Sequence, residues 1–401
     1  MLPSRSRVSM DSQTAARPFP AIIPHRSFPL IRMNVPLAPY TTLSVGGPAR
    51  FMVEATDETQ VQTALEHASD RGWPVFVMGG GSNVIVADEG FPGLVLRVLL
   101  TGMRFEGPHG AEVTAAAGEE WDLFVSRCIH RGLAGIECLS GIPGTVGGAP
   151  VQNAGAYGQE VGAVIRSVRA FDRQTNRIVE LGHEECAFAY RSSLFNSSQR
   201  DRYVILNVNF RLRSGGAPQI DYSDLKEYFA TQPTRPTLED VRNAVVEVRS
   251  RKGMVLVPGA PDSKSAGSFF KNPILAVDEA RFVEEIAHQR GILKASERLH
   301  YYLLGSNRVK LSAAWLIERA GFPKGYRRGS VGVSAKHSLA IVNHGGASAG
   351  DVIDLMEQIQ DGVRGVFGIH LIPEPVFVGF PEAWPSNYGT VRLPALSAMG
   401  S

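Results

Sequence analysis

Two glycine-rich stretches decide the fold: Val77-Met78-Gly79-Gly80-Gly81-Ser82-Asn83-Val84-Ile85-Val86 and Ser140-Gly141-Ile142-Pro143-Gly144-Thr145-Val146-Gly147-Gly148. A shorter one, Val45-Gly46-Gly47-Pro48, precedes them. Without a side chain, glycine lets backbone N–H groups converge on an anion at close range. Three such stretches in the first half of the chain, each after an apolar run, favour a dinucleotide site over unrelated tight turns. None matches the Walker A or G-x-G-x-x-G pattern, which argues against a P-loop ATPase and a Rossmann dehydrogenase.

The composition is that of an ordinary globular protein. The chain has 401 residues, 44% hydrophobic and 20% charged, and its length predicts two or three domains of about 100–200 residues each. A formal net charge of +2 offers no electrostatic footprint for nucleic acid. No apolar run approaches the ~20 residues that span a bilayer. We therefore expect a soluble protein with neither a nucleic-acid nor a membrane partner.

The cysteines and histidines suggest neither disulfides nor a metal site. The three cysteines form no CxxC pair and no even-numbered framework, so we expect reduced, buried thiols in a cytoplasmic protein: Cys128, Cys138 and Cys186. The HExxH and G-x-S-x-G motifs are absent, and four histidines stand apart from metal-ligand spacings: His130, His183, His337 and His344. We expect no metal.

Helical and strand periodicities alternate between the two ends of the chain. They predict helices over 57–71, 121–128 and 237–248, the last opened by a capping box of Thr237 and Asp240, and two later helices around Trp315 and over 352–359. Strands are predicted over 75–78 and 204–212, the latter with one polar face. Mixed elements without strict βαβ alternation indicate α+β domains, and Ser214-Gly215-Gly216-Ala217-Pro218 is the best boundary between them.

Both ends lack periodicity. We expect residues 1–33 to form a disordered arm and residues 383–401 a tail. The arm is rich in arginine, but its prolines would break the amphipathic helix of a transit peptide, so we expect no targeting role.

The glycine stretches and several other motifs resemble the UDP-N-acetylenolpyruvoylglucosamine reductase family from about Asn34 to Gly379. The matching motifs are Val77–Val86 and Ser140–Gly158, then Ala189-Tyr190-Arg191-Ser192-Ser193-Leu194-Phe195, Ala266-Gly267-Ser268-Phe269-Phe270-Lys271-Asn272-Pro273, Ala313–Glu318, Val331–His337 and Pro373-Glu374. The resemblance implies a vanillyl-alcohol-oxidase (PCMH) type fold, in which two α+β subdomains hold non-covalent FAD and a C-terminal α+β domain binds a UDP-sugar. The implied division is an arm 1–33, an FAD-binding domain 34–213, a substrate-binding domain 214–363, a return segment 364–382 with Glu374, and a tail 383–401.

The implied reaction is that of UDP-N-acetylmuramate dehydrogenase in peptidoglycan synthesis. NADPH reduces FAD, and hydride then passes to UDP-N-acetylglucosamine enolpyruvate. The resemblance implies that Ser268 protonates the carbon beside the carboxylate and that Arg191 and Glu374 stabilise the enol-like intermediate. The chemistry suits these residues, because a guanidinium and a carboxylic acid can hydrogen-bond a carboxylate that gains charge. Lys271 would help to stabilise the anion that the Ser268 hydroxyl leaves.

The remaining site residues also follow from the resemblance. FAD contacts are implied at Gly79, Gly80, Gly81, Ser82, Asn83, Val84, Ser140, Gly144, Thr145, Gly147, Gly148, Asn153, Gly155 and Ala156. Substrate contacts are implied at Tyr157, Tyr222, Lys252, Lys271 and Asn272. One departure from the family's pattern is Pro375, which restrains the preceding Glu374 to extended geometry and could change the aim of its carboxyl group.

Two alternatives remain open. An oxidase of small alcohols or sugars could share the FAD fold, although such relatives often tether flavin through His or Cys and the Gly79–Val84 loop has neither. A flavin- or nucleotide-sugar-binding regulator without turnover is the other, and the joint presence of Arg191, Ser268 and Glu374 argues against it.

Overall fold

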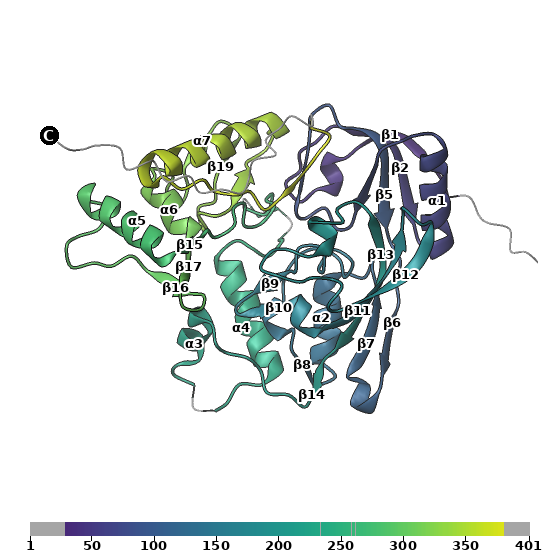
Figure 1. Cartoon of the computed structure of the whole chain (residues 1–401), viewed down its shortest axis with the longest axis horizontal. Coiled ribbons are helices and arrows are strands. Elements are labelled where there is room, and N and C mark those ends of the chain that lie inside the picture. The colour runs from purple at the N-terminus through teal and green to yellow at the C-terminus, as the bar shows by residue number, and fades with distance from the viewer. Residues whose placement is uncertain (1–28, 233, 258, 261, 381–401) are drawn as a thin grey trace, which may run out of the picture.

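The computed structural model describes residues 29–380 except 233, 258 and 261 (Figure 1). The predicted tail 383–401 and the first 28 residues of the predicted arm lie outside the described residues. Strand β1 (Arg32–Pro36) begins inside that arm, and Arg32 pairs with Met52. The last two residues of the predicted arm therefore lie in a strand, held by backbone hydrogen bonds that no periodic pattern in the sequence indicates.

The first sheet has four strands in the order β1-β2-β5-β3, with β2 (Pro48–Ala55), β5 (Phe91–Val98) and β3 (Val75–Met78). Strand β1 runs antiparallel to β2, whereas β2, β5 and β3 are mutually parallel. The predicted first helix is α1 (Glu58–Asp70), capped by Asp57, which accepts a hydrogen bond from the Gln60 N–H. Its buried stripe packs against the sheet, on the outer side of the molecule (Figure 1).

The second sheet has five antiparallel strands in the order β12-β11-β13-β7-β6. They are β12 (Arg177–Gly182), β11 (Ile165–Asp172), β13 (Tyr203–Arg211), β7 (Glu112–Ala116) and β6 (Met103–Glu106). Helix α2 (Trp121–Ile129) packs on it through Trp121 and Phe124, whose rings meet Phe210. The polar face predicted for 204–212 is only partly present, because Ile205 is also buried at this central strand.

Asp172, at the end of β11, offers a test of stability. Its carboxylate accepts hydrogen bonds from Arg202 Nε (3.0 Å) and Nη2 (2.7 Å), which hold its pKa below the ordinary value. We expect Asp172→Asn to lower the midpoint of urea unfolding at pH 7. The contribution of a depressed pKa is present above the unfolded value of about 4 and is lost at lower pH, so the difference from wild type should shrink in acid. A constant difference across pH would contradict this account.

Shorter elements link the sheets and form the turns around them. The short strands are β4 (Val84–Val86), β8 (Leu133–Ala134), β9 (Gly155–Ala156), β10 (Gln159–Glu160) and β14 (Arg213–Ser214). The 3₁₀ turns span Ala38–Tyr40, Pro108–Gly110, Glu137–Leu139, Val161–Val164 and Leu194–Asn196. Strand β14 pairs with β8, so the stretch proposed as a domain boundary begins within a strand of the preceding half.

Helices α3 (Ser223–Phe229) and α4 (Leu238–Arg251) follow this boundary. The capping box of Thr237 and Asp240 that opens α4 is confirmed. The apolar side of α4 packs in one cluster with Leu225 from α3 and with Cys138 and Tyr157 from the preceding half. Helix α4 thus stands between the two halves of the molecule (Figure 1).

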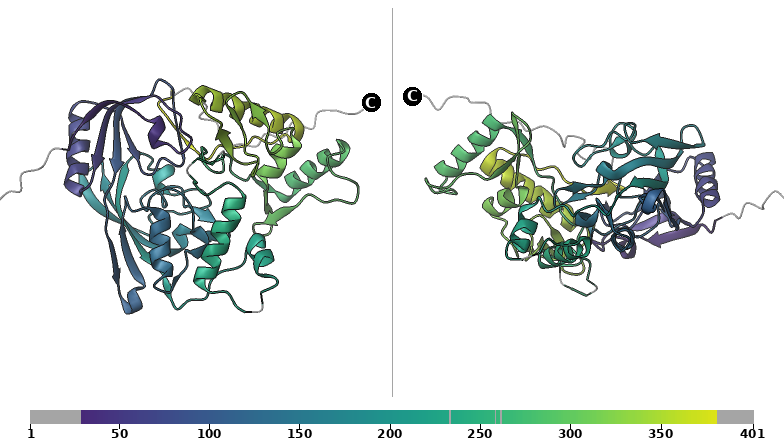
Figure 2. Two further views of the ribbon diagram at one scale, coloured as in Figure 1. Left: turned by 180° about the vertical axis from the view of Figure 1, so that it is seen from behind. Right: turned by 90° about the horizontal axis from the view of Figure 1, so that it is seen from below.

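The C-terminal half has its own core. One three-stranded sheet consists of β15 (Ile274–Ala276), β17 (Arg308–Leu311) and β16 (Tyr301–Leu303), and another of β18 (Arg327–Arg328), β19 (Val331–Val333) and β20 (Ile341–Asn343). They pack with α5 (Val277–Gln289), α6 (Ala313–Arg319) and α7 (Ala349–Phe367). In the views of Figure 2, these helices lie at the end opposite α1.

The chain then returns to the first half. Helix α7 continues to Phe367 because Val363 and Phe367 extend its buried stripe, and its C-cap Gly368 (φ +71°) lies within the predicted return segment 364–382. Strand β21 (Val376–Val378) pairs in parallel with β4. The return segment therefore runs beside the end of the first glycine stretch. The division into domains at 213/214 stays a prediction.

Candidate active site

A cavity of about 610 Å³ lies where the glycine stretches meet the C-terminal half. All three predicted catalytic residues line it: Arg191, Ser268 and Glu374. Other predicted site residues in its wall are Ser82, Asn83, Gly155, Ala156, Tyr157, Tyr222, Lys252 and Asn272. Its volume lies within the usual range for small-molecule sites, about 300–1,000 Å³.

The two long glycine stretches touch each other backbone to backbone. A Cβ atom at Gly80 would lie 2.8 Å from Cα of Gly144, and one at Gly79 would lie 2.7 Å from Oγ1 of Thr145. The Ser82 hydroxyl donates to the Pro143 carbonyl at 3.1 Å, which joins the stretches beside the cavity. Closely packed loops beside the cavity, which leave their peptide groups uncovered by side chains, suit a dinucleotide diphosphate, which needs backbone donors at short range. The residues present therefore fit FAD.

Two other predicted FAD residues, Ser140 and Asn153, are buried and absent from the described cavity wall. Ser140 is fully buried and donates its hydroxyl to the Glu137 carbonyl, and the buried Asn153 amide bonds Glu160, the Ala189 carbonyl and the Gly162 N–H. These two side chains are used within the protein, so they shape the loops. All of the FAD contacts stay predictions. The predicted FAD residues that are also absent from the described cavity wall are Gly79, Gly80, Gly81, Val84, Gly144, Thr145, Gly147 and Gly148.

Arg191 is held in a strained turn. Ala189 and Ser192 exchange both of their backbone hydrogen bonds, at 2.9 and 3.0 Å, and Arg191 between them has φ +52°. A non-glycine residue in this left-handed region costs about 1–3 kcal/mol and is found where function uses the geometry. Its Nη2 donates to the Gly155 carbonyl at 2.9 Å. The guanidinium is thereby fixed toward the cavity.

Glu374 pairs with Arg191. Its Oε1 lies 3.0 Å from Arg191 Nε, and its side chain is only 10% exposed. The Glu374 N–H donates to the Phe269 carbonyl at 2.8 Å. Glu374 lines the cavity even though Pro375 follows it in the chain. Burial raises the pKa of Glu374, although the charges of Arg191 and Lys271 oppose this. The carboxyl group therefore holds its proton to a higher pH than an exposed glutamate.

Ser268 stands at the cavity end of a buried segment. Phe269 and Phe270 behind it are at most 1% exposed, and the Phe269 N–H donates to the Leu339 carbonyl at 2.7 Å. The Lys271 N–H donates to Ile372 O, so this segment lies beside the return segment that carries Glu374. Burial lowers the pKa of Lys271, which is absent from the described cavity wall but interacts electrostatically with Glu374 and Arg191.

Three basic side chains of the cavity wall, called the basic end below, are Arg249, Lys252 and Arg298. Lys252 Nζ pairs with Asp224 at 3.0 Å. Burial, aided by the charges of Lys252, Lys324 and Arg249, lowers the pKa of His337 to about 4, so this imidazole is neutral at pH 7. The cavity thus has cationic groups in its wall in addition to the Arg191–Glu374 pair.

Known proteins match nearly the whole described chain. Residues 49–182 match the FAD binding domain model, and residues 260–378 match the C-terminal domain model of UDP-N-acetylenolpyruvoylglucosamine reductase. The UDP-N-acetylenolpyruvoylglucosamine reductase of Thermobifida fusca (strain YX) is 47% identical over 351 residues, covering 86% of this chain and 97% of the relative. The chain belongs to the UDP-N-acetylenolpyruvoylglucosamine reductase family. The reductase of Streptomyces avermitilis is 45% identical over 349 residues, covering 86% and 94%.

A solved structure of a UDP-N-acetylenolpyruvoylglucosamine reductase agrees. The Thermus caldophilus enzyme is 28% identical, with a TM-score of 0.60 over 88% of this chain and all of that one. The predictions of an α+β fold with a PCMH-type FAD-binding domain, and of an FAD-dependent oxidoreductase of peptidoglycan synthesis with NADPH as reductant, are confirmed. In the described part of the chain no helix combines the length and hydropathy needed to cross a membrane, and no group of side chains could hold a metal.

Several cavity residues of this UDP-N-acetylenolpyruvoylglucosamine reductase family member escaped the sequence analysis: Gln152, Arg249, Arg298, His300, Tyr302 and His337. One signal was available, because Arg249 precedes Lys252 by three residues and so shares its side of a helix. Arg298, His300 and Tyr302 gave no such signal, because only the tertiary fold brings this segment to the cavity. His337 lies within a quoted motif, but an isolated histidine is more often structural.

The flavin should leave the protein on denaturation. The three cysteines are buried and absent from the described cavity wall, and burial raises the pKa of each thiol, to about 12 for Cys128 and Cys186. We expect yellow protein from which acid or urea releases all FAD into the filtrate, measured by absorbance. Flavin that stays with the precipitated chain would contradict this and favour a tethered-flavin oxidase.

Proposed function

We propose that this cavity is where the chain reduces UDP-N-acetylglucosamine enolpyruvate to UDP-N-acetylmuramate, with Arg191, Ser268 and Glu374 as its catalytic residues. The observation that carries the proposal is the buried Arg191–Glu374 pair, which shares one cavity wall with the Ser268 hydroxyl. FAD, when bound, would supply the hydride that it takes from NADPH. The other requirements fall on side chains of this chain.

Arg191 and Glu374 would stabilise the charge that develops on the substrate carboxylate. A fixed guanidinium that is already held by Gly155 and Glu374 needs no reorganisation when that charge appears. Glu374 must donate a hydrogen bond to help, and only its protonated form can do so. The raised pKa of Glu374 therefore suits this role.

Ser268 would give its hydroxyl proton to the carbon beside the carboxylate. Among the described residues its side chain makes no hydrogen bond, so the hydroxyl is available to a ligand. The positive charges of Lys271 and Arg191 favour the serine alkoxide that remains until water returns a proton. Hydride and proton together account for the two hydrogens that the substrate gains.

The basic end would bind the UDP portion. Arg249, Lys252 and Arg298 provide cationic donors for a diphosphate, and Tyr222 stands edge-on to Tyr157 with ring centroids 5.4 Å apart. Burial raises the pKa of Tyr222 to about 12, so its hydroxyl remains a donor at neutral pH. These contacts would fix the enolpyruvyl group at the other end.

The decisive experiment measures NADPH oxidation by FAD-loaded protein with and without UDP-N-acetylglucosamine enolpyruvate. We expect rapid, substrate-dependent oxidation and a product two hydrogens heavier than the substrate by mass spectrometry. NADPH oxidation that ignores the substrate and forms peroxide from oxygen would favour the oxidase alternative. FAD binding without any turnover would favour the regulator.

A further inference from the structure

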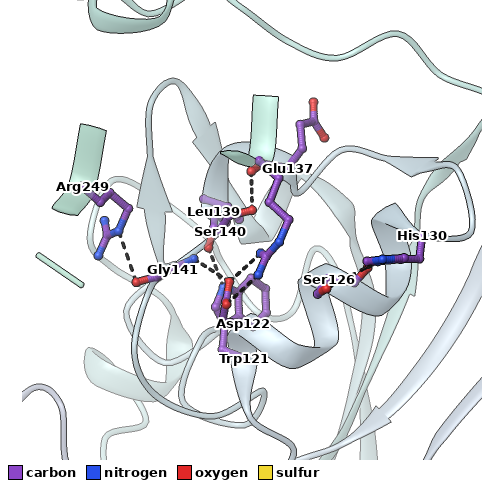
Figure 3. A network of polar contacts seen from close by, with 10 residues as sticks. Trp121, Asp122, Ser126, His130, Glu137, Leu139, Ser140, Gly141 and Arg249 are labelled. Atoms are coloured by element: carbon purple, nitrogen blue, oxygen red, sulfur yellow. Dashed lines mark hydrogen bonds and ion pairs between the residues drawn. The ribbon is translucent and has the colours of Figure 1, made fainter. Parts of the chain in front are cut away.

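Asp122 links two parts of the cavity that are distant in sequence. It is the second residue of α2, and its carboxylate accepts the Gly141 N–H at 2.6 Å (Figure 3). The same carboxylate accepts both terminal nitrogens of Arg242, on α4, at 2.7 and 2.8 Å. Such a two-point guanidinium–carboxylate contact fixes orientation as well as distance.

Helix α4 also reaches the other side of Gly141. Arg249 Nε donates to the Gly141 carbonyl at 3.2 Å (Figure 3). Its Nη2 donates to the Met254 carbonyl at 2.9 Å. Arg242 and Arg249 are about two helical turns apart and so lie on one side of α4. Both polar groups of Gly141 are therefore held by α4, one directly and one through Asp122.

The position of Gly141 matters for the cavity. The next two residues, Ile142 and Pro143, line it, and Pro143 receives the Ser82 hydrogen bond that joins the glycine stretches. At the end of α4, Arg249 and Lys252 form part of the basic end. The Asp122–Arg242 contact thus connects the loop of Gly141, Ile142 and Pro143 with the helix whose end carries Arg249 and Lys252.

The pair is ionised and partly shielded. The side chains of Arg242 and Asp122 are 15% and 30% exposed. Burial alone would raise the pKa of Asp122, but the hydrogen bonds from Arg242 and Gly141 outweigh it and leave the pKa below its ordinary value. The Asp122 charge also acts on Arg249, whose hydrogen-bond partners in the described chain are both carbonyl groups.

We infer that Asp122 and Arg242 are positioning residues for substrate binding. They hold the Arg249–Lys252 end of α4 at a fixed distance from the loop of Gly141, Ile142 and Pro143. The inference rests on the proposed function. A pair that served stability alone would leave substrate affinity unchanged in the folded, FAD-loaded protein. The Asp172–Arg202 pair provides the matched control, because it is also a two-point contact but bonds neither Gly141 nor any residue of α4.

The experiment compares Asp122→Asn, Arg242→Gln and the double variant with Asp172→Asn, each loaded with FAD. Asn at 122 still accepts the Gly141 N–H but gives up the ion pair. Losing a charge-assisted contact should raise KM for UDP-N-acetylglucosamine enolpyruvate roughly ten-fold, with kcat within about two-fold. The double variant should match the single ones, and Arg242→Lys should recover part of the loss, because lysine keeps the charge without the fork.

The controls separate this inference from the proposed function. Flavin reduction by NADPH should be unchanged in all variants, and Asp172→Asn should lower the urea midpoint without moving KM. An unchanged KM in the Asp122 and Arg242 variants, or loss of FAD before any rise in KM, would overturn the inference. If Asp122→Asn does not fold, Arg242→Lys carries the same comparison. A wild-type protein without substrate-dependent turnover would instead overturn the proposed function.

Discussion

Ser268→Ala should leave the bleaching of FAD by NADPH within a few-fold of wild type and slow reoxidation by the enolpyruvyl substrate by about 10²–10⁴-fold. The two half-reactions differ in their need for this hydroxyl. The first needs only a correctly placed cofactor, whereas the second needs a proton at carbon as hydride arrives. Stopped-flow absorbance at the flavin band measures both steps on one preparation.

Ser265→Ala is the control from the same loop. The Ser265 hydroxyl accepts the Gly267 N–H at 3.1 Å, so its loss disturbs the approach to Ser268 without removing the proposed acid. We expect a loss of less than ten-fold in reoxidation. Equal slowing of both half-reactions in Ser268→Ala would show that Ser268 supports the flavin pocket. Normal reoxidation would assign the proton to another group, with Glu374 as the next candidate.

Arg191→Gln should have the second-largest effect. Removing one preorganised donor for a developing charge typically costs 10²–10³-fold in rate, and we expect reoxidation to fall by about that amount. Flavin reduction by NADPH should change little. Arg191→Lys should be intermediate, because one ammonium group cannot reproduce the contacts with both Gly155 and Glu374.

The pH dependence of Arg191→Gln provides an independent readout. Burial raises the pKa of Glu374, and Arg191 currently opposes that rise. If protonated Glu374 is needed, reoxidation falls as the pH rises through its pKa, and without Arg191 that fall should move to higher pH. Rates of reoxidation measured across pH would show it. An unmoved profile, or equal losses in both half-reactions, would mean that Arg191 acts mainly by holding the turn to Gly155.

Local patterns predicted the local structure well. Helices α1 and α4 were recognisable because their buried stripes and their caps, Asp57 and Thr237, lie within one segment. The end of α7 and the strand β1 were not predicted from the sequence. Both depend on partners elsewhere: Phe367 is buried by the C-terminal core, and Arg32 pairs with Met52.

The site was only partly accessible from sequence. Ser268 and Arg191 read alone resemble a turn serine and a surface arginine, and only the family motifs marked them as catalytic. No local pattern marks Arg298 or His337, because each reaches the cavity through the packing of the C-terminal half. The Asp122–Arg242 contact joins residues 120 positions apart and leaves no trace in either helical pattern.

The pairing of β21 with β4 also bears on how the enzyme is made. The Asn83 side chain donates to the Glu374 carbonyl across 291 positions of the chain. Synthesis proceeds from the N-terminus, and domains fold as they emerge from the ribosome. The FAD-binding half is therefore exposed to flavin long before Glu374 exists. A nascent chain could capture its cofactor early, and we expect a chain truncated after α7 to bind FAD without turning over substrate, because it lacks Glu374.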